Sequence, residues 1–292
     1  MTASEVVPLI TERPFASEEI PALKALLVEC LPLSAHLAGV LEAYAWSPTE
    51  IANRSIGFWV GDQLVAVVLK GQVIRIACKH ADPDTTLGNA ITSSVVSHFS
   101  SDTRAVMGPV GILEGLRSAT GAPHIDSVTV WERSAQAHAS RGALRVPGQD
   151  ELASFSDASF EAFREELGQV PAADPRDPTY LKTWELARDQ GRILGVWGDQ
   201  GECIYRVELR PALGRVAELR GVWLHPSLRG KGLALTYLEE TVALVSDLGA
   251  PSAVAMTRCG NHAAERLYRR AGFAPVGQLS RLELAQFASS LK

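Results

Sequence analysis

Residues 229–234 form the short segment that most restricts how this chain can fold. They read Arg-Gly-Lys-Gly-Leu-Ala and follow an apolar run that ends at Pro226, which is typical of a strand. Apolar residues then recur at helical spacing over residues 235–245. A glycine-containing turn that begins a helix leaves backbone amide hydrogens unpaired beside the positive end of the helix dipole. The segment therefore predicts a binding site for a pyrophosphate group.

Two common phosphate-binding loops do not fit the segment. Gly232 is followed by leucine and alanine, so the Gly-Lys-Ser/Thr ending of a P-loop is missing. Leu235 stands where a dinucleotide-binding loop has its third glycine. The pattern that remains is Arg-x-x-Gly-x-Ala.

A second pattern lies about thirty residues further along the chain. Residues 252–257 are typical of a short strand, and residues 261–273 contain Asn-x-x-Ala-x-x-x-Tyr-x-x-x-Gly-Phe. Asn261 is a typical helix N-cap, and Gly272 is a typical helix stop. Asn261 and Tyr268 are seven residues apart, so both lie on one face of the predicted helix.

Together, these two patterns resemble the GNAT superfamily of acetyltransferases, over about residues 145–285. The resemblance implies an α/β fold whose mixed, mostly antiparallel sheet is flanked by helices. It also implies that the phosphate-binding loop holds acyl-CoA, with acetyl-CoA as co-substrate. Within this domain we expect helices from Asp150 and over 160–168, and a closing strand over 275–284.

The first half of the chain has the same predicted order of elements. Helices are expected at 18–30 and 34–45, three strands between 56 and 77, and then helix, strand, helix and strand up to Trp131. We therefore expect two tandem GNAT-like units, a degenerate one at 1–140 and a catalytic one at 141–292. The first has no glycine pair after its third strand, and Asp82 and Asp84 would repel a pyrophosphate there.

The resemblance also implies a role for individual residues. Amides of Val222, Trp223 and Leu224 would hold the pantetheine and polarise the thioester carbonyl. The residues expected to contact the pyrophosphate or the rest of the cofactor are Arg229, Gly230, Lys231, Gly232, Leu233, Ala234 and Asn261. Lys231 and Arg229 either add charge to the loop or point into water, and Asn261 either caps its helix or also bonds the cofactor. Trp223 is expected to pack in the core.

Two residues are candidates for proton transfer, and each has a structural alternative. Tyr268 is the candidate acid for the departing thiolate, or else it packs its helix onto the sheet. Glu218, four residues before Val222, is the candidate base, or else a strand-end carboxylate paired with Arg220. Three arginines near Tyr268, at 266, 269 and 270, are expected to form a solvated face.

Charge and cysteine content limit the possible partners. The net charge is −5, which argues against nucleic acid as a main partner. The four cysteines form no C-x-x-C pair, so neither a zinc site nor a disulfide framework is indicated. No signal peptide or long apolar span is evident, so we expect a cytoplasmic protein that binds no membrane. We also expect no bound metal, and a homodimer is one of the oligomeric states that the sequence allows.

These observations favour an N-acetyltransferase that moves acetyl from acetyl-CoA to a primary amine of a small molecule or protein by direct attack. A protein that binds acyl-CoA as a sensor or scaffold, without efficient turnover, is the alternative. A third possibility is transfer of an acyl group longer than acetyl. The patterns do not distinguish among possible amines.

Overall fold

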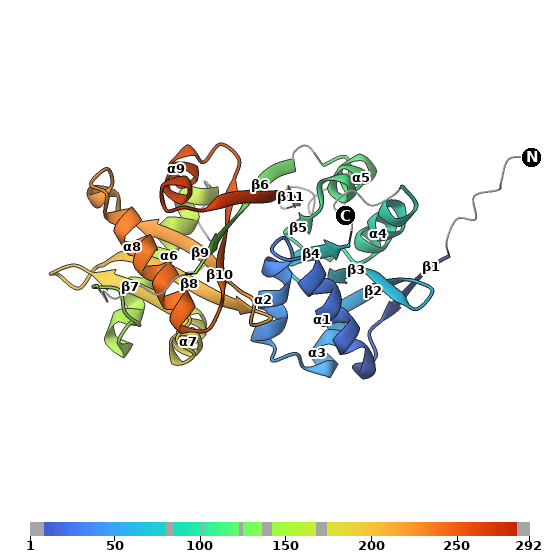
Figure 1. Ribbon diagram of the computed structural model, residues 1–292, viewed down its shortest axis with the longest axis horizontal. Coiled ribbons are helices and arrows are strands. Elements are labelled where there is room, and N and C mark those ends of the chain that lie inside the picture. Colours follow the sequence, from blue (N-terminus) through green and yellow to red (C-terminus); the bar gives the residue numbers. More distant parts are fainter. Residues whose placement is uncertain are drawn as a thin grey trace, which may run out of the picture. The chain divides into compact units, whose positions relative to one another are not determined.

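A computed structural model describes residues 9–79, 85–100, 102–122, 125–135, 142–167 and 174–284. The chain divides into two compact units. The first unit comprises Met1–Val130, Arg258–Gly260 and Val276–Lys292, and the second comprises Trp131–Thr257 and Asn261–Pro275. Both contain a sheet with parallel and antiparallel strands and flanking helices, which confirms the predicted fold class (Figure 1).

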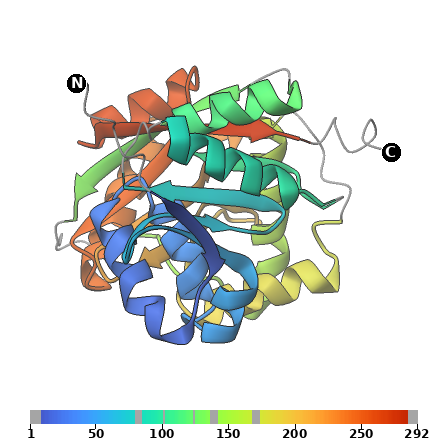
Figure 2. The ribbon, with the colours of Figure 1, turned by 90° about the vertical axis from the view of Figure 1, so that its right-hand side faces the viewer.

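The first unit is built on strands in the order β1-β2-β3-β4-β5-β11. Neighbouring strands run antiparallel, except that β4 and β5 are parallel. Helices flank the sheet on both faces, with α4 and α5 on one side and α1 to α3 on the other (Figure 2). The strands are β1 (Ile10–Pro14), β2 (Ser55–Val60), β3 (Gln63–Leu69), β4 (Val73–Cys78), β5 (Ala105–Gly108) and β11 (Ala274–Glu283). The helices are α1 (Ile20–Glu29), α2 (Ala35–Ala43), α3 (Pro48–Arg54), α4 (Thr85–Ser97) and α5 (Val110–Thr120).

The second unit repeats this arrangement, with strands in the order β7-β8-β9-β10-β6. Here β7, β8 and β9 are antiparallel, and β9 and β10 are parallel. The strands are β6 (Ile125–Ser134, of which the second half belongs to this unit), β7 (Ile193–Trp197), β8 (Cys203–Ala212), β9 (Val216–Leu224) and β10 (Ser252–Arg258). The helices are α6 (Leu152–Leu167), α7 (Pro178–Asp189), α8 (Leu233–Asp247) and α9 (His262–Arg270).

Strand alternation gives the second sheet two different faces. Leu219 and Tyr205 pack with residues of α8 and α9 in one core cluster. Trp223 packs on the opposite face, with Phe155 of α6 and Ala187 of α7. We call these the α8/α9 face and the α6/α7 face.

The prediction of two separate helices between Asp150 and residue 168 is wrong. A second helix was expected over residues 160–168, but residues 160–167 continue the first, because α6 runs without a break to Leu167. The next helix is α7, which the sequence analysis missed. Asp177 caps it by accepting from the Thr179 amide at 2.8 Å, and Pro178 occupies its first turn.

The predicted strand at 275–284 is present as β11, but it pairs with β5 of the first unit. Leu282, fully buried, packs into the core cluster beneath α4 and α5. The chain's last described strand therefore completes the sheet of the first unit. In the described part of the chain no helix is both long and apolar enough to span a bilayer.

Candidate active site

The segment 229–234 joins β9 to α8, as the sequence pattern predicts. A single 3-10 turn, Pro226–Leu228, leads into it, and α8 begins at Leu233. Gly230 and Gly232 have φ values of +77° and +82°, which side chains other than glycine rarely adopt. Two glycines are thus required by the shape of this loop.

The amides of this loop are available to a ligand. Among the described residues, no backbone carbonyl accepts from the amides of residues 230–234, and the first amide bonded beyond them is that of Leu235, which donates to Gly232 at 3.0 Å. Gly232 provides no side-chain cap for the helix. Several neighbouring amides at a helix N-terminus form a concave positive site for an anion.

The Arg229 side chain turns away from these amides. Its Nε donates to the Leu224 carbonyl at 2.9 Å, and its Nη2 donates to both carboxylate oxygens of Glu165 on α6, at 3.0 and 2.7 Å. Trp223 Nε1 also donates to Glu165, at 3.2 Å. The guanidinium of Arg229 therefore links the loop to α6, while Lys231 is exposed.

Strands β9 and β10 separate beside the loop. Their pairing covers Val216–Leu219 of β9 and ends at Leu219↔Ala255. Val222, Trp223 and Leu224 lie beyond this last pair, and the β8–β9 register shifts next to them. The separation leaves one edge of β9 without a strand partner, which suits a ligand that adds its own hydrogen bonds to the edge.

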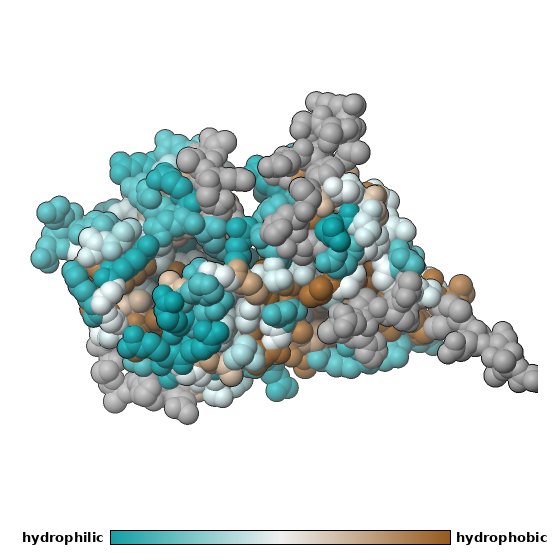
Figure 3. Space-filling model, turned by 90° about the horizontal axis from the view of Figure 1, so that it is seen from above, coloured by the Kyte–Doolittle hydropathy of each residue, from teal (hydrophilic) through white to brown (hydrophobic). Residues whose placement is uncertain are grey.

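Asn261 and Gly272 mark the two ends of α9, as predicted. The Asn261 Oδ1 accepts from the Ala264 amide at 3.2 Å, so the side chain is an N-cap. Gly272 follows the helix with φ +78°. The surface on the side of the molecule that carries α9 is largely hydrophilic (Figure 3), and its three arginines at 266, 269 and 270 are exposed, which confirms the expected solvated face.

Tyr268 lies inside the second unit, 4% exposed, with its ring stacked on Trp131 at 6.3 Å and edge-on to Phe273 at 5.2 Å. Burial raises the pKa of its hydroxyl above the ordinary value. Its hydroxyl makes no hydrogen bond to another described residue. Tyr268 therefore remains protonated near neutral pH, and it also packs its helix onto the sheet.

Glu218 is buried on the α6/α7 face, 5% exposed. One carboxylate oxygen lies 3.8 Å from Nε of Arg220. The other, Oε2, is sealed from solvent and has no hydrogen-bond partner among the described residues. A buried carboxylate oxygen without a partner is costly, so it marks a position where a proton donor can be received.

Comparison with known proteins identifies the domain that holds these groups. Residues 155–273 match the model of the acetyltransferase (GNAT) family. The second unit is a GNAT acetyltransferase domain. No curated protein sequence matches the chain. The GNAT match makes the chain an acyltransferase, and the family uses acetyl-CoA as the acetyl donor.

Solved GNAT proteins have the same fold over nearly the whole chain. A GCN5-related N-acetyltransferase from Sphaerobacter thermophilus is 18% identical, with a TM-score of 0.59, over 94% of this chain and 96% of its own. A GNAT-family acetyltransferase from Colwellia psychrerythraea is 16% identical, with a TM-score of 0.58, over 94% and 99%. A tandem GNAT protein from the clavulanic acid biosynthesis pathway is 12% identical, with a TM-score of 0.55, over 94% and 98%.

The sequence patterns did not predict the roles of two residues of the GNAT domain, Glu165 and Arg206. Glu165 connects α6 to the loop, and Arg206 lies buried on the α6/α7 face. Glu165 has no local signal, because its partners are about sixty residues away. For Arg206 a signal exists: Arg206, Glu208 and Arg210 alternate along one strand, which puts three charges on one face.

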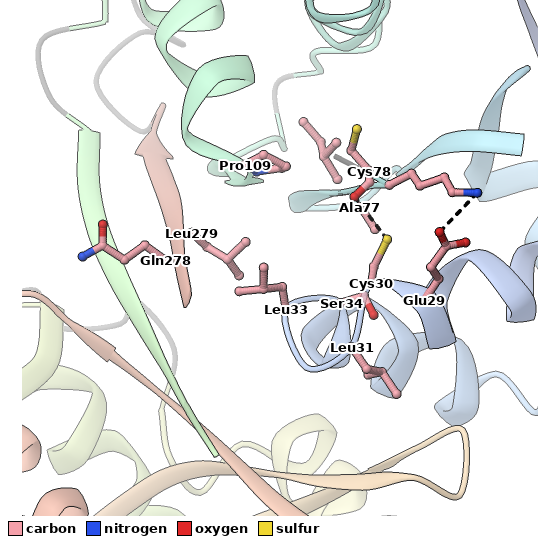
Figure 4. Close-up of a pocket in the computed structure, with 12 residues that line it drawn as sticks. Glu29, Cys30, Leu31, Leu33, Ser34, Ala77, Cys78, Pro109, Gln278 and Leu279 are labelled. Carbon is pink, nitrogen blue, oxygen red and sulfur yellow. Dashed lines mark hydrogen bonds and ion pairs between the residues drawn. The ribbon is translucent and has the colours of Figure 1, made fainter. Parts of the chain in front are cut away.

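A cavity of about 180 Å³ lies in the first unit (Figure 4). Cys30 and Ser34 line it from the segment between α1 and α2, Ala77 from β4, Pro109 after β5 and Leu279 from β11. The Cys30 thiol donates to the Cys78 carbonyl at 3.1 Å, and burial raises its pKa to about 12. This thiol is therefore neutral and a poor nucleophile.

At the edge of the cavity Lys79 pairs with Glu29 at 3.2 Å. Asp82 and Asp84, which were expected to exclude a pyrophosphate from the first unit, lie outside the described residues. No cluster of metal-ligating side chains is found in the part of either unit that the structure describes.

Proposed function

We propose that the chain transfers an acetyl group from acetyl-CoA to a primary amine of a small molecule or protein, by direct attack of the amine on the thioester. One observation carries this proposal. In the GNAT domain, β9 separates from β10 after Leu219, and the loop that follows β9 has amides at 230–234 that donate to no backbone carbonyl among the described residues. A cofactor with a pyrophosphate at one end and an extended arm at the other fits such an arrangement.

The loop would hold the pyrophosphate, and β9 would hold the arm. Backbone amides of Gly230 to Ala234 supply the anion site, with Lys231 adding charge from the surface. Amides of Val222 to Leu224 bond the pantetheine arm and polarise the thioester carbonyl. Loss of one such donor typically raises the barrier by about 3 kcal/mol. Asn261 remains a candidate for a cofactor contact in addition to its capping role.

Glu218 is the proposed general base. The attacking nitrogen must be a neutral amine, so an ammonium acceptor first gives one proton to Oε2, directly or through a water molecule. The nitrogen lone pair then forms the C–N bond, and the C–S bond breaks. Nε of Arg220 lies 3.8 Å from the other oxygen and places a positive charge beside the carboxylate.

Tyr268 is the proposed general acid. The departing thiolate takes the phenolic proton, and the proton that leaves the new amide nitrogen restores the phenol. Burial keeps Tyr268 protonated, as an acid must be, but it also makes the proton harder to give up. The thiolate must therefore be close to the hydroxyl when the C–S bond breaks.

We further propose that the second unit, which holds most of the expected catalytic domain at 141–292, carries the catalysis, and that the first unit, built mainly from the expected domain at 1–140, is GNAT-like without an acyl-CoA loop. None of the four cysteines, all in the described part of the chain, forms a disulfide, which favours a reducing setting such as the cytoplasm.

Calorimetry with acetyl-CoA and a labelled-acetyl assay on an amine panel and a peptide pool test the proposal. We expect acetyl-CoA to bind, and Tyr268→Phe to bind it normally while turnover falls. The absence of any acyl-CoA binding would refute the proposal. Tight binding without turnover on any acceptor would instead favour a sensor or scaffold, and faster turnover with longer thioesters would replace acetyl as the transferred group.

A further inference from the structure

Arg206 is a buried cation whose hydrogen-bonding capacity is unused. It is 5% exposed and its guanidinium stacks over the rings of Phe155 and Trp184, at 4.8 and 5.5 Å. It makes no side-chain hydrogen bond or ion pair with any described residue. Its Nε is sealed and unpartnered. A guanidinium has five N–H donors, and those of Arg206 have no acceptor among the described residues.

The carboxylate of Glu208 does not hydrogen-bond to Arg206. Glu208 lowers the energy of the Arg206 charge through space, but its oxygen accepts from Arg210 at 2.9 Å and from Arg192 at 3.4 Å. Burial lowers the pKa of Arg206 to about 10, so the side chain stays protonated at neutral pH. A buried charge without hydrogen bonds is destabilising, and an anionic partner would remove that penalty.

The guanidinium lies against the backbone next to the proposed thioester site. A Cβ built on Gly221 would stand 2.5 Å from Arg206 Nη1, and Gly221 has φ +55°. Gly221 immediately precedes Val222, the first of the amides proposed to hold the cofactor arm. An anion bound to Arg206 would thus sit beside the reacting carbonyl, on the α6/α7 face that also carries Glu218.

The fold does not need charges at this place. In the first unit β3 and β4 correspond to β8 and β9 in strand order. The β3 residues Val67 and Leu69 are buried and apolar, at 0% and 1% exposure, where β8 has alternating charges. Replacing buried ionic groups by apolar ones is often neutral or stabilising. A buried Arg206 whose Nε has no partner among the described residues therefore points to a ligand.

We propose that Arg206 binds a carboxylate of the acceptor, so that the acceptor is a small amine that also carries a carboxylate, as an amino acid does. A planar guanidinium matches a carboxylate with two parallel hydrogen bonds. The carboxylate at Arg206 would hold the amine between Glu218 and the thioester. This inference rests on the proposed function, because it names the acceptor class for the same site.

Matched acceptors test the proposal. β-Alanine and β-alaninamide differ only at the carboxylate, and each α-amino acid can be compared with its amide in the same way. We expect wild-type kcat/KM to be at least about tenfold higher for the acids, as charge-assisted hydrogen bonds imply. Arg206→Gln should bring the ratio close to one through KM. Arg192→Gln, which removes another arginine beside Glu208, should leave the ratio unchanged.

Three results would overturn the proposal: equal kcat/KM for acids and amides in the wild type, a preference that survives Arg206→Gln, or better turnover of an amine that carries a phosphate. Should Arg206→Gln fail to fold, Arg206→Lys keeps the charge without the planar fork and must still lower the ratio.

A binding experiment separates this inference from the proposed function. N-acetyl-β-alanine is titrated by calorimetry into wild type and Arg206→Gln in the presence of CoA. If no amine is acetylated, the transferase proposal fails, but binding that is lost in Arg206→Gln would still support a carboxylate site. No binding to either protein would refute that site.

Discussion

Gly232→Ala is the most informative perturbation of the phosphate-binding loop. Gly232 has φ +82°, and a Cβ there would meet no atom within 4 Å. The substitution therefore strains the backbone without a clash. Gly249, after the end of α8, is a matched control with φ +80° and equally open space.

The left-handed φ and the open space around both glycines determine the expected losses of stability and of acetyl-CoA affinity. A non-glycine residue in the left-handed region costs about 1–2 kcal/mol. Both variants should therefore lower the melting temperature of a unit of this size by about 2 to 8 °C. Only Gly232→Ala should shift the loop amides away from the pyrophosphate. Loss of one hydrogen bond to a charged group, about 1.5–3 kcal/mol, weakens acetyl-CoA binding by about 10- to 100-fold.

Calorimetric titration of acetyl-CoA into wild type, Gly232→Ala and Gly249→Ala measures the binding, and thermal melts followed by circular dichroism measure the stability. Wild-type affinity in Gly232→Ala, with the expected loss of stability, would refute the assignment of the loop. An equal loss of affinity in both variants would refute it too, because strain at either end of α8 would then have the same effect.

Three further predictions concern catalysis, pH and the loop's anchor. Glu218→Gln should lower kcat by about 10²- to 10⁴-fold while acetyl-CoA binds unchanged in calorimetry; wild-type turnover would exclude it as the base. Stability should fall as pH rises above about 10, because burial raises the pKa of Tyr205 and Tyr268, and the unfolded chain then releases protons that the folded chain retains. Urea unfolding between pH 8 and 11 checks this, and a flat profile contradicts it. Glu165→Gln breaks a partly exposed ion pair with Arg229 and should lower the free energy of unfolding, measured in urea, by about 1 kcal/mol or less. A much larger loss would contradict the conclusion that this ion pair is weak.

Local patterns predicted most of the strands and helices, because these elements carry their own periodicity, whereas β1, α3 and α7 were not predicted. The meander of β2, β3 and β4 and the helix α9 with its caps at Asn261 and Gly272 follow directly from alternation, turns and capping residues. The predicted division at residue 160 is wrong, because residues 155–160 contain no helix breaker; α6 continues to Leu167, and α7 begins at Pro178. The pairing of β11 with β5 has no local signal, since a strand's own sequence does not specify which sheet it joins.

The candidate site also contains some features that the sequence predicts and others that depend on distant residues. The glycine loop and the cap at Asn261 are local, so the sequence predicted their form. The anchoring of Arg229 by Glu165 and the isolation of Arg206 depend on residues distant in the chain. Those contacts exist only once α6 packs on β9, so they required a structure.

The distribution of groups over the two faces of the second unit favours direct attack over an acyl-enzyme. Cys203 is buried, its thiol donates to the Tyr205 carbonyl at 3.2 Å, and burial raises its pKa to about 12, so it is a poor nucleophile at neutral pH. Glu218 lies on the α6/α7 face, whereas Tyr268 packs in the core of the α8/α9 face. The pairing of β9 with β10 ends at Leu219, one residue after Glu218. An amine can then lose its proton to a carboxylate on one face while the thiolate gains a proton on the other. If Glu218 is the base and Tyr268 the acid, as proposed, the sheet lies between them and a single ternary complex would serve both proton transfers.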